Sequence, residues 1–413
     1  MNENVKPTNT QTKADDRPVR YYIPAIEKMR LILMGLAILY TFGSYSPIAE
    51  INGAVLGFVF PALFIISGYL VIWEGPATDK RILKAIGKTA ICFVVLTGVF
   101  ILLSLWADKA KTLELLTSRW FWMDFLVLNK CALPIGSTIW YVQSLLYAYI
   151  IVYVIYKLKL IRLDLLIAIL CLAFAVVSGE LAKVVNFCFK GHDYLGGNFL
   201  TRALPYILIG SFLHRKRKYF GSKPVSLHFV IGFLGFLAAA AEYVALRMTG
   251  KNYYVGHLFG MAFVAMAVCA FCFYVDGMEL FNENFLYLTR FELMLPYIIS
   301  SPVNYLLVRF FEKQTAPSIL MASRFKGIII LVITFALLFI YAAIRAAIGK
   351  KHEGSLSDGI KYEYLDNAYD KDFVYVDEEA EEEGYHTEYM DNAYDKDFVY
   401  VDPDLEEEED EDE

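Results

Sequence analysis

A few arginine and glutamate residues stand inside or at the ends of long apolar runs, where a charge is costly and usually has a function. Arg30 precedes ten uncharged residues and then Thr41. Arg202 begins another apolar run, and Glu242 follows four alanines, which predicts close helix packing around a carboxylate that needs a partner. A guanidinium can hold an anionic group, and a carboxylate can act as a general base. For Arg30 an anchor that extends to the bilayer surface is an equally good interpretation.

The composition indicates that these residues belong to a membrane protein. Of the 413 residues 57% are hydrophobic and 20% are charged, fewer charges than a soluble domain of this length carries. Apolar runs near 20 residues recur and are long enough to cross a bilayer. They lack the strict alternation of a membrane β-barrel. We therefore predict an all-α polytopic membrane protein that lies in a lipid bilayer, and we expect no nucleic-acid partner.

The apolar runs predict about ten transmembrane helices, with N- and C-termini in the cytoplasm. The positive-inside rule sets this orientation, because basic residues gather between alternate spans, around Lys80, Lys157 and Arg215. Arg290 and Glu292 would lie outside the bilayer if the ninth helix starts late. The predicted spans are 30–47, 53–73, 86–106, 135–157, 161–179, 201–214, 226–246, 255–275, 286–308 and 326–347.

Three parts of the chain differ in composition. Residues 1–28 are polar, 29–348 form the predicted membrane domain, and 349–413 form an acidic tail that we expect to be disordered. Residues 352–413 hold 26 acidic residues and three lysines, so the rest of the chain is strongly basic. The tail repeats the segment DNAYDKDFVYVD at 366–377 and 391–402. A cytosolic protein could bind these repeats by strand addition, or the tail could simply keep the chain solvated.

Motifs for other chemistries are missing. Cys269 and Cys272 form a CxxC on an apolar run, where we interpret them as small packing residues. The six histidines are scattered, and none pairs by spacing with a second metal ligand, so we expect no metal. The segment 112–130 is amphipathic and aromatic, which is typical of a helix in the outer interface or one that dips back into the protein.

Four segments, taken in order, resemble the integral-membrane acyltransferase family 3. The resemblance covers about residues 21–348, with Arg30 at the start of the opening helix. FIISGYL is similar to the family's second span, and Ser67-Gly68 within it predicts close helix packing. STIWYVQSLL resembles the family's Trp-centred motif, here around Trp140. TRALPYILIGSFL resembles the family's Arg-x-x-Pro-Tyr segment. LPYIISSPVNYLL is similar to the family's penultimate helix. The segments lie at 64–70, 137–146, 201–213 and 295–307.

The resemblance implies transfer of an acyl group from a cytosolic acyl-CoA to an extracytoplasmic hydroxyl, often on a surface glycan. Arg30 and Arg202 would hold anionic groups, while Ser67, Trp140 and Ser300 are candidates for substrate contact. In the family a histidine follows the first-helix arginine at the place of Thr41. Histidines also often stand where this chain has Thr138 and Ser300. A hydroxyl has no basic site that titrates near neutral pH, but it can donate a hydrogen bond or accept an acyl group. Arg30, Thr41 and Glu242 are therefore the candidate catalytic residues, with Glu242 as the candidate base.

Two other functions remain open on the sequence. Without the histidines, the same fold could serve as a non-catalytic membrane receptor or scaffold with a partner-binding tail. A transporter is less favoured, because no inverted pair of broken spans is visible.

Overall fold

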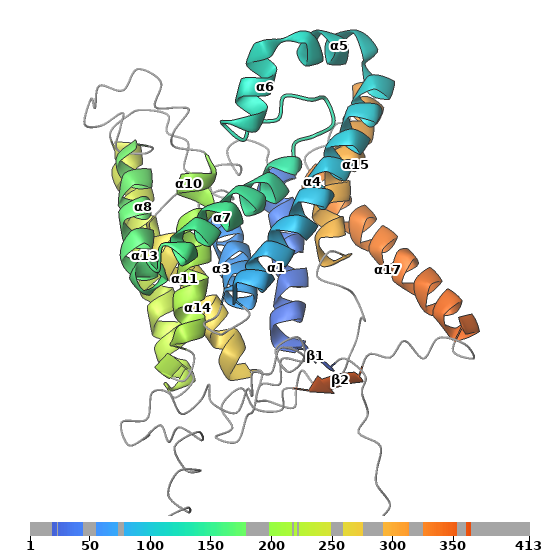
Figure 1. The fold of residues 1–413 in the computed structure, drawn as a ribbon. Helices are drawn as coiled ribbons and strands as arrows, with labels where there is room; N and C mark the ends of the chain where they lie inside the picture. The colour runs from blue at the N-terminus through green and yellow to red at the C-terminus, as the bar shows by residue number, and fades with distance from the viewer. Residues whose placement is uncertain are drawn as a thin grey trace, which may run out of the picture.

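The computed structural model describes residues 19–22, 24–43, 55–72, 78–178, 198–216, 219–220, 223–248, 259–275, 292–313, 325–352 and 361–364. Within these ranges the membrane body is helical, as predicted (Figure 1). Its helices are α1 (Pro24–Phe42), α3 (Val59–Val71), α4 (Thr78–Ala107), α5 (Lys109–Thr117), α6 (Arg119–Leu126), α7 (Ile139–Lys157), α8 (Asp164–Ser178), α10 (Phe199–Arg202), α11 (Leu204–Arg215), α13 (Val225–Met248), α14 (Gly260–Val275), α15 (Leu295–Glu312) and α17 (Lys326–His352), with the 3₁₀ turns η1 (Ile161–Leu163) and η3 (Glu292–Met294).

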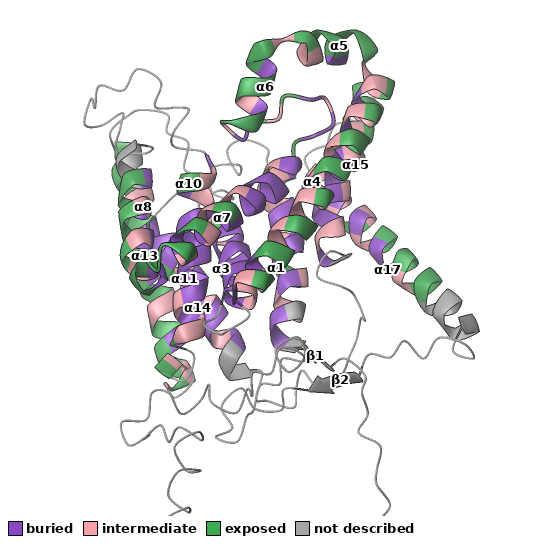
Figure 2. Cartoon of the chain, in the orientation of Figure 1, coloured by how far each residue is buried: buried purple, intermediate pink, exposed green. Residues whose placement is uncertain are grey.

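The short helices α3 and α11 form the centre of the bundle. All but two of the thirteen residues of α3 are buried, and the two helices pack tightly along glycines (Figure 2). A Cβ atom added at Gly68 would lie 2.1 Å from the carbonyl oxygen of Ile207, and one added at Gly210 would lie 2.1 Å from that of Ile65. No side chain fits at either place, so the two backbones are in direct contact. This confirms the close packing predicted from Ser67-Gly68.

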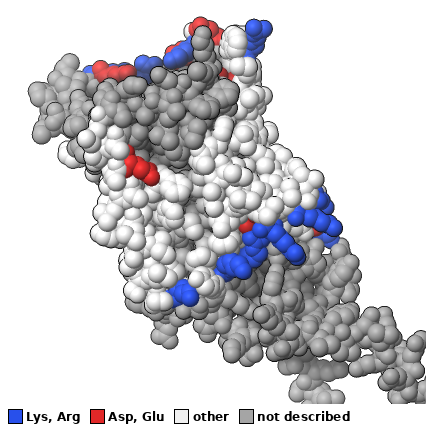
Figure 3. Space-filling view, turned by 90° about the vertical axis from the view of Figure 1, so that its left-hand side faces the viewer, with Lys and Arg blue, Asp and Glu red and all other residues white. Residues whose placement is uncertain are grey.

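The outer helices present large apolar side chains to their surroundings. Ile91 and Leu102 on α4 are each 68% exposed, and Phe229 on α13 is 65% exposed. In water such a surface would be an aggregation site, but against hydrocarbon it is favourable. A broad band with few charges is visible on the face shown in Figure 3, with lysine and arginine gathered below it and charges of both signs above it. The chain is therefore a membrane protein.

Each of the ten predicted spans coincides with a helix, although the bounds differ. Among the described residues, four helices are long and apolar enough to cross a membrane by length and composition: Thr78–Ala107, Ile139–Lys157, Val225–Ala245 and Lys326–Arg345. α3, with 13 residues, is only about 20 Å long at 1.5 Å per residue, shorter than a hydrocarbon core of about 30 Å. The count of ten crossings and their orientation remain predictions.

Prolines occupy different places in the helices than the predicted spans suggested. Span 286–308 would place Pro296 in a helix interior, but α15 begins at Leu295, so Pro296 falls in its first turn. Pro61 likewise lies in the first turn of α3. Proline is tolerated there because the missing N–H would have no helical partner. The proline inside α15 is instead Pro302. Arg290 lies outside the described residues, and Glu292 begins η3, just before the helix.

The aromatic segment after α4 forms a cap at one end of the molecule. α5 runs across this end and α6 turns back from it toward the bundle, opposite the strands β1 and β2 (Figure 1). Asp108 begins α5 by accepting a hydrogen bond from the backbone N–H of Lys111 at 3.1 Å. Tyr305 of α15 donates to the carbonyl oxygen of Ala107 at 3.1 Å. The predicted amphipathic segment is thus helical, and α15 is bonded to the chain just before it.

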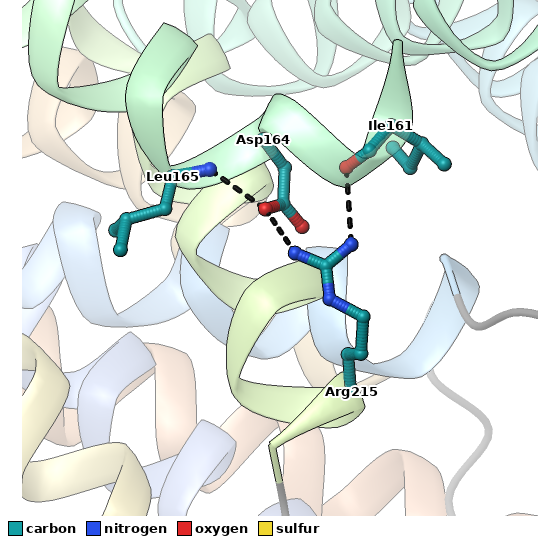
Figure 4. Close-up of polar contacts among 4 residues, drawn as sticks. All are labelled: Ile161, Asp164, Leu165 and Arg215. Atoms are coloured by element: carbon teal, nitrogen blue, oxygen red, sulfur yellow. Dashed lines mark hydrogen bonds and ion pairs between the residues drawn. The ribbon is translucent and has the colours of Figure 1, made fainter. Parts of the chain in front are cut away.

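A buried ion pair joins α8 to α11 (Figure 4). The Asp164 side chain is fully buried and accepts hydrogen bonds from the Arg215 guanidinium and from the backbone N–H of Leu165. Arg215 also donates to the carbonyl oxygen of Ile161 at 3.2 Å. Arg215 belongs to the basic cluster 215–218 that we used for orientation, and its charge is matched inside the bundle.

Two short strands, β1 (Val19–Tyr22) and β2 (Lys361–Tyr364), pair in parallel. Residues 361–364 belong to the tail for which we expected disorder, so this pairing links the tail to the segment before α1. The rest of the tail, including both copies of the repeat, lies outside the described residues.

Candidate functional site

Three helices meet at the hydroxyl of Tyr297, which is fully buried near the start of α15. The indole N–H of Trp140, from the first turn of α7, donates to Tyr297 Oη at 3.1 Å. The hydroxyl of Thr41, from the end of α1, donates to the same oxygen at 3.4 Å. Thr41 and Trp140 are partly exposed. Two sequence-predicted residues are therefore brought together by a tyrosine that sequence reasoning missed.

Arg202 reaches the same cluster from a fourth element. Its guanidinium carbon lies 5.6 Å from the centroid of the Trp140 ring, within the range of a cation–π contact. Arg202 ends the short helix α10, which begins where Asn198 accepts a hydrogen bond from the N–H of Leu200 at 3.0 Å. The side chain of Arg202 is partly exposed. It supplies a positive charge beside Trp140 that an anionic group can meet.

A layer of aromatic rings supports the cluster. Phe60 of α3 lies 4.7 Å from the ring of Trp140 and 5.4 Å from that of Tyr297, both edge to face. Tyr40 packs edge to face on Phe60 at 5.5 Å, and Tyr141 lies 6.1 Å from Tyr297. Such pairs fix ring orientation, because the electron-poor edge of one ring meets the electron-rich face of the next. The positions of the indole and the phenol are thus set by packing.

The polar turn before α7 holds Trp140 from its backbone side. Asn129, in a left-handed conformation with φ 57°, donates to the carbonyl oxygen of Trp140 at 3.2 Å and also contacts the Ser144 hydroxyl. Gln143 is fully buried and donates to the carbonyl oxygen of Phe125 in α6. Asparagine tolerates the left-handed region better than most residues. These contacts connect the cap helices to the cluster.

Thr138 and Ser300 are both fully buried and bonded to the backbone of α15. The Thr138 hydroxyl donates to the carbonyl oxygen of Ile298 at 3.3 Å. That carbonyl is four residues before Pro302, which has no N–H to offer it. Ser300 donates to the carbonyl oxygen of Tyr297 within its own helix. The structure therefore places both predicted positions beside the cluster, with their hydroxyls engaged by backbone.

Arg30 lies nearer the start of α1 than Thr41 and is more buried. A separation of eleven positions amounts to about three helical turns and a rise of about 16 Å, so both residues are on one face of α1 at different heights. Arg30 is buried and interacts electrostatically with Tyr141. Ser67 donates to the carbonyl oxygen of Leu63 at 2.8 Å and lies beside Tyr141. Tyr141 in turn lies 6.1 Å from Tyr297, to which Thr41 donates.

Glu242 is placed apart from this cluster. Its carboxylate accepts a hydrogen bond from the backbone N–H of Gly260 at 3.3 Å, at the first residue of α14. Close packing around it, predicted from the four alanines, is confirmed, since a Cβ added at Gly260 would lie 2.4 Å from the backbone nitrogen of Ala239. A carboxylate at a helix N-terminus satisfies an N–H that has no helical partner. The geometry assigns Glu242 a capping contact.

The cysteine pair serves packing, as we interpreted it. Cys269 and Cys272 are both buried, and the thiol of Cys269 contacts the carbonyl oxygen of Ala62 at 3.7 Å. Within the described residues, no group of three or more His, Cys, Asp or Glu side chains could hold a metal ion.

Tyr297 and Phe60 are the residues that sequence reasoning missed. Both stand in uncharged segments, and aromatic residues are common throughout this chain, so their types alone carry no signal. The position of Tyr297 next to the family-like Pro296, three residues before Ser300, is the one local hint.

Comparison with known proteins gives one result. The family model for acyltransferase family 3, described as an acyltransferase domain, matches residues 31–291. This range includes Thr41, Ser67, Trp140, Arg202 and Glu242, begins one residue after Arg30, and ends before Tyr297 and Ser300. No curated protein and no solved structure matches the chain.

Proposed function

The chain belongs to acyltransferase family 3, and from this premise we propose that it moves an acyl group from a cytosolic acyl-CoA to an extracytoplasmic hydroxyl. A surface glycan is the acceptor class that the family favours. The observation that carries the proposal is that Thr41 and Trp140 both donate to the buried Tyr297 while Arg202 lies against the ring of Trp140. Four separate segments of the chain contribute to this cluster. A receptor or scaffold is not favoured, because neither needs such a cluster inside the bundle.

The two arginines are proposed to bind anionic groups at different depths. Arg30 lies about 16 Å from Thr41 along α1, toward the end of the helix that the positive-inside rule places in the cytoplasm. It would hold the donor, whose coenzyme A part carries phosphates. Arg202 lies beside Trp140 near the cap formed by α5 and α6, and it would hold an anionic part of the acceptor or of the acyl group. The acyl chain would pass between these two depths.

Acylation in cells tests the proposal. Surface polysaccharide from cells with and without the protein should differ in acyl content, and purified protein should consume the thioester when an acceptor is present. Arg202→Ala should lower transfer about 10- to 100-fold, which corresponds to losing a hydrogen bond to a charged group at about 1.5–3 kcal/mol. Unchanged acyl content together with no thioester consumption would reject the proposed function.

Arg119 offers a matched control. It lies 5.1 Å from the ring centroid of Trp120 on α6, where both side chains are exposed. Arg119→Ala therefore removes the same kind of arginine–tryptophan contact outside the cluster, and transfer should remain at the wild-type level.

A further inference from the structure

The hydrogen bonds around Tyr297 have a direction imposed by chemistry. An indole N–H is a donor only, so Tyr297 Oη must accept from Trp140 Nε1 at 3.1 Å. The phenolic proton then has to point elsewhere. Among the described residues, the other hydrogen-bonding partner of Tyr297 Oη is the Thr41 hydroxyl at 3.4 Å. The three groups form a chain of contacts from α7 through α15 to α1.

The exposed end of this chain is Thr41. Tyr297 is fully buried, whereas Thr41 is partly exposed, so a ligand can reach the threonine hydroxyl more readily than the phenol. In the structure the Thr41 hydroxyl donates to Tyr297. Hydroxyl hydrogens rotate to suit their partners. When an acceptor atom approaches Thr41, the hydrogen bond between the two hydroxyls can therefore reverse its direction. The phenol of Tyr297 then donates to Thr41, and Thr41 donates to the approaching atom.

We propose, on the basis of the proposed acyl transfer, that Trp140, Tyr297 and Thr41 form a donor relay that ends on the carbonyl oxygen of the acyl group. Thr41 is the catalytic residue, because its hydroxyl touches the reacting oxygen. Tyr297 and Trp140 are positioning residues that act through it. Aligned hydrogen bonds polarise one another in a low-dielectric site. A preorganised donor of this kind stabilises the negative charge that develops on the carbonyl oxygen.

The reaction balances without a histidine base. The acceptor hydroxyl oxygen forms a bond to the acyl carbon, the carbonyl oxygen takes up negative charge, and the relay holds it. The carbon–sulfur bond then breaks, and the electron pair leaves with the sulfur. The proton of the acceptor hydroxyl goes to this thiolate, so the products are an ester and free coenzyme A. The relay donates hydrogen bonds throughout and keeps all its protons.

A double-mutant cycle with purified full-length protein tests the relay. Thr41→Val removes the hydroxyl with little change in shape, and Tyr297→Phe removes the phenolic oxygen but keeps the ring. Each should lower kcat about 100- to 1000-fold, the usual effect of losing one oxyanion donor, with KM for the acyl-CoA nearly unchanged. Since both act through one hydrogen bond to the substrate, the double variant should be no slower than the slower single variant.

Two further variants separate this role from a structural one. Thr41→Ser keeps the hydroxyl and should retain most of the activity. Tyr305→Phe makes the same substitution two turns along α15, at a tyrosine bonded to the carbonyl oxygen of Ala107, and should leave kcat unchanged. A loss of thermal stability in Tyr297→Phe without a fall in kcat would assign the phenol a structural role and overturn the relay.

The remaining outcomes distinguish the relay from the proposed function. Full activity of Thr41→Val, or losses that multiply in the double variant, would overturn the relay while acyl transfer stands. A wild-type protein that transfers no acyl group would remove the proposed function and the relay with it.

Discussion

At the scale of single residues, the three hydroxyl side chains that stand in place of family histidines all make specific contacts. Thr41 bonds the phenol of Tyr297, while Thr138 and Ser300 bond carbonyl oxygens of α15. None of the three can replace an imidazole as a base. Their contacts converge on the same helix, so these positions still form one centre, with hydrogen-bond donors where the family has titrating groups.

Glu242 is the residue whose role is most directly open to test. Glu242→Gln keeps an oxygen that can accept from Gly260 but removes the basic carboxylate, so we expect acyl transfer and thermal stability close to wild type. Glu242→Ala should lower the free energy of unfolding by about 1 kcal/mol, the usual value for a lost helix cap. Acyl content and the thermal unfolding midpoint are the measurements. Inactive but stable Glu242→Gln protein would instead identify Glu242 as the base.

At the scale of elements, α15 is bonded to the start of α7 at the place where Pro302 removes a hydrogen bond within α15. Pro302 leaves the carbonyl oxygen of Ile298 without its helical donor, and Thr138 supplies one. One turn away, Ser301 accepts from the backbone N–H of Ser137 at 3.2 Å. The start of α7, which carries Trp140, is therefore fixed against the segment of α15 that carries Tyr297.

A suppressor pair tests this coupling. Thr138→Val leaves the carbonyl oxygen of Ile298 unsatisfied and should destabilise the protein by about 1–3 kcal/mol. Adding Pro302→Ala restores an N–H four residues after Ile298, and most of the lost stability should return. Thermal unfolding in detergent measures both variants. If Pro302→Ala adds its own loss to that of Thr138→Val, the hydrogen bond to Ile298 does not hold the two helices together.

The contact between α3 and α11 gives a second prediction for helices. Gly68→Ala places a methyl group where the carbonyl oxygen of Ile207 already lies. Overpacking usually costs about 1–3 kcal/mol, and here the opposing atom belongs to the backbone, so we expect little folded protein. Gly98→Ala on α4 is the control, since nothing lies within 4 Å of its added methyl group. The yield of monodisperse protein after purification compares them, and equal yields would contradict the close approach.

At the scale of the whole molecule, the cap of α5 and α6 lies at one end and the strands β1 and β2 at the other (Figure 1). Arg30 lies in the half of α1 that follows β1, and Thr41, which donates to Tyr297, lies at the other end of this helix. This arrangement supports a donor that enters from one side of the membrane and an acceptor that enters from the other.

Cysteine labelling tests the orientation. Lys111 on α5 and Lys216 at the end of α11 are both exposed. A membrane-impermeant maleimide should label Lys111→Cys in intact cells and Lys216→Cys only after the membrane is opened, with the parent chain as the control for its own cysteines. Labelling of both positions from the same side would reject the proposed path through the bundle.

Much of the fold could be predicted from local patterns. Apolar runs of bilayer length predict helices because an isolated backbone in hydrocarbon must satisfy its own hydrogen bonds. Ser67-Gly68 and the four alanines before Glu242 predicted the close packing that the structure confirms. Helix starts were less accurate: α4 begins at Thr78, eight residues before the predicted span, because its charged first turns continue the helix beyond the apolar run.

By itself the sequence determined the helical membrane body and the family, and it predicted Thr41, Trp140 and Arg202 as site residues, since all of these follow from residue types in a fixed order along the chain. Only the tertiary structure decided that Thr41 and Trp140 meet at Tyr297 with Arg202 beside Trp140. It also decided that Glu242 contacts the start of α14 and that Thr138 donates to the carbonyl oxygen that Pro302 leaves without a helical donor. These contacts join residues far apart in the chain, Thr41 and Tyr297 by 256 positions. Such distances are set by how helices pack, and no local pattern records them.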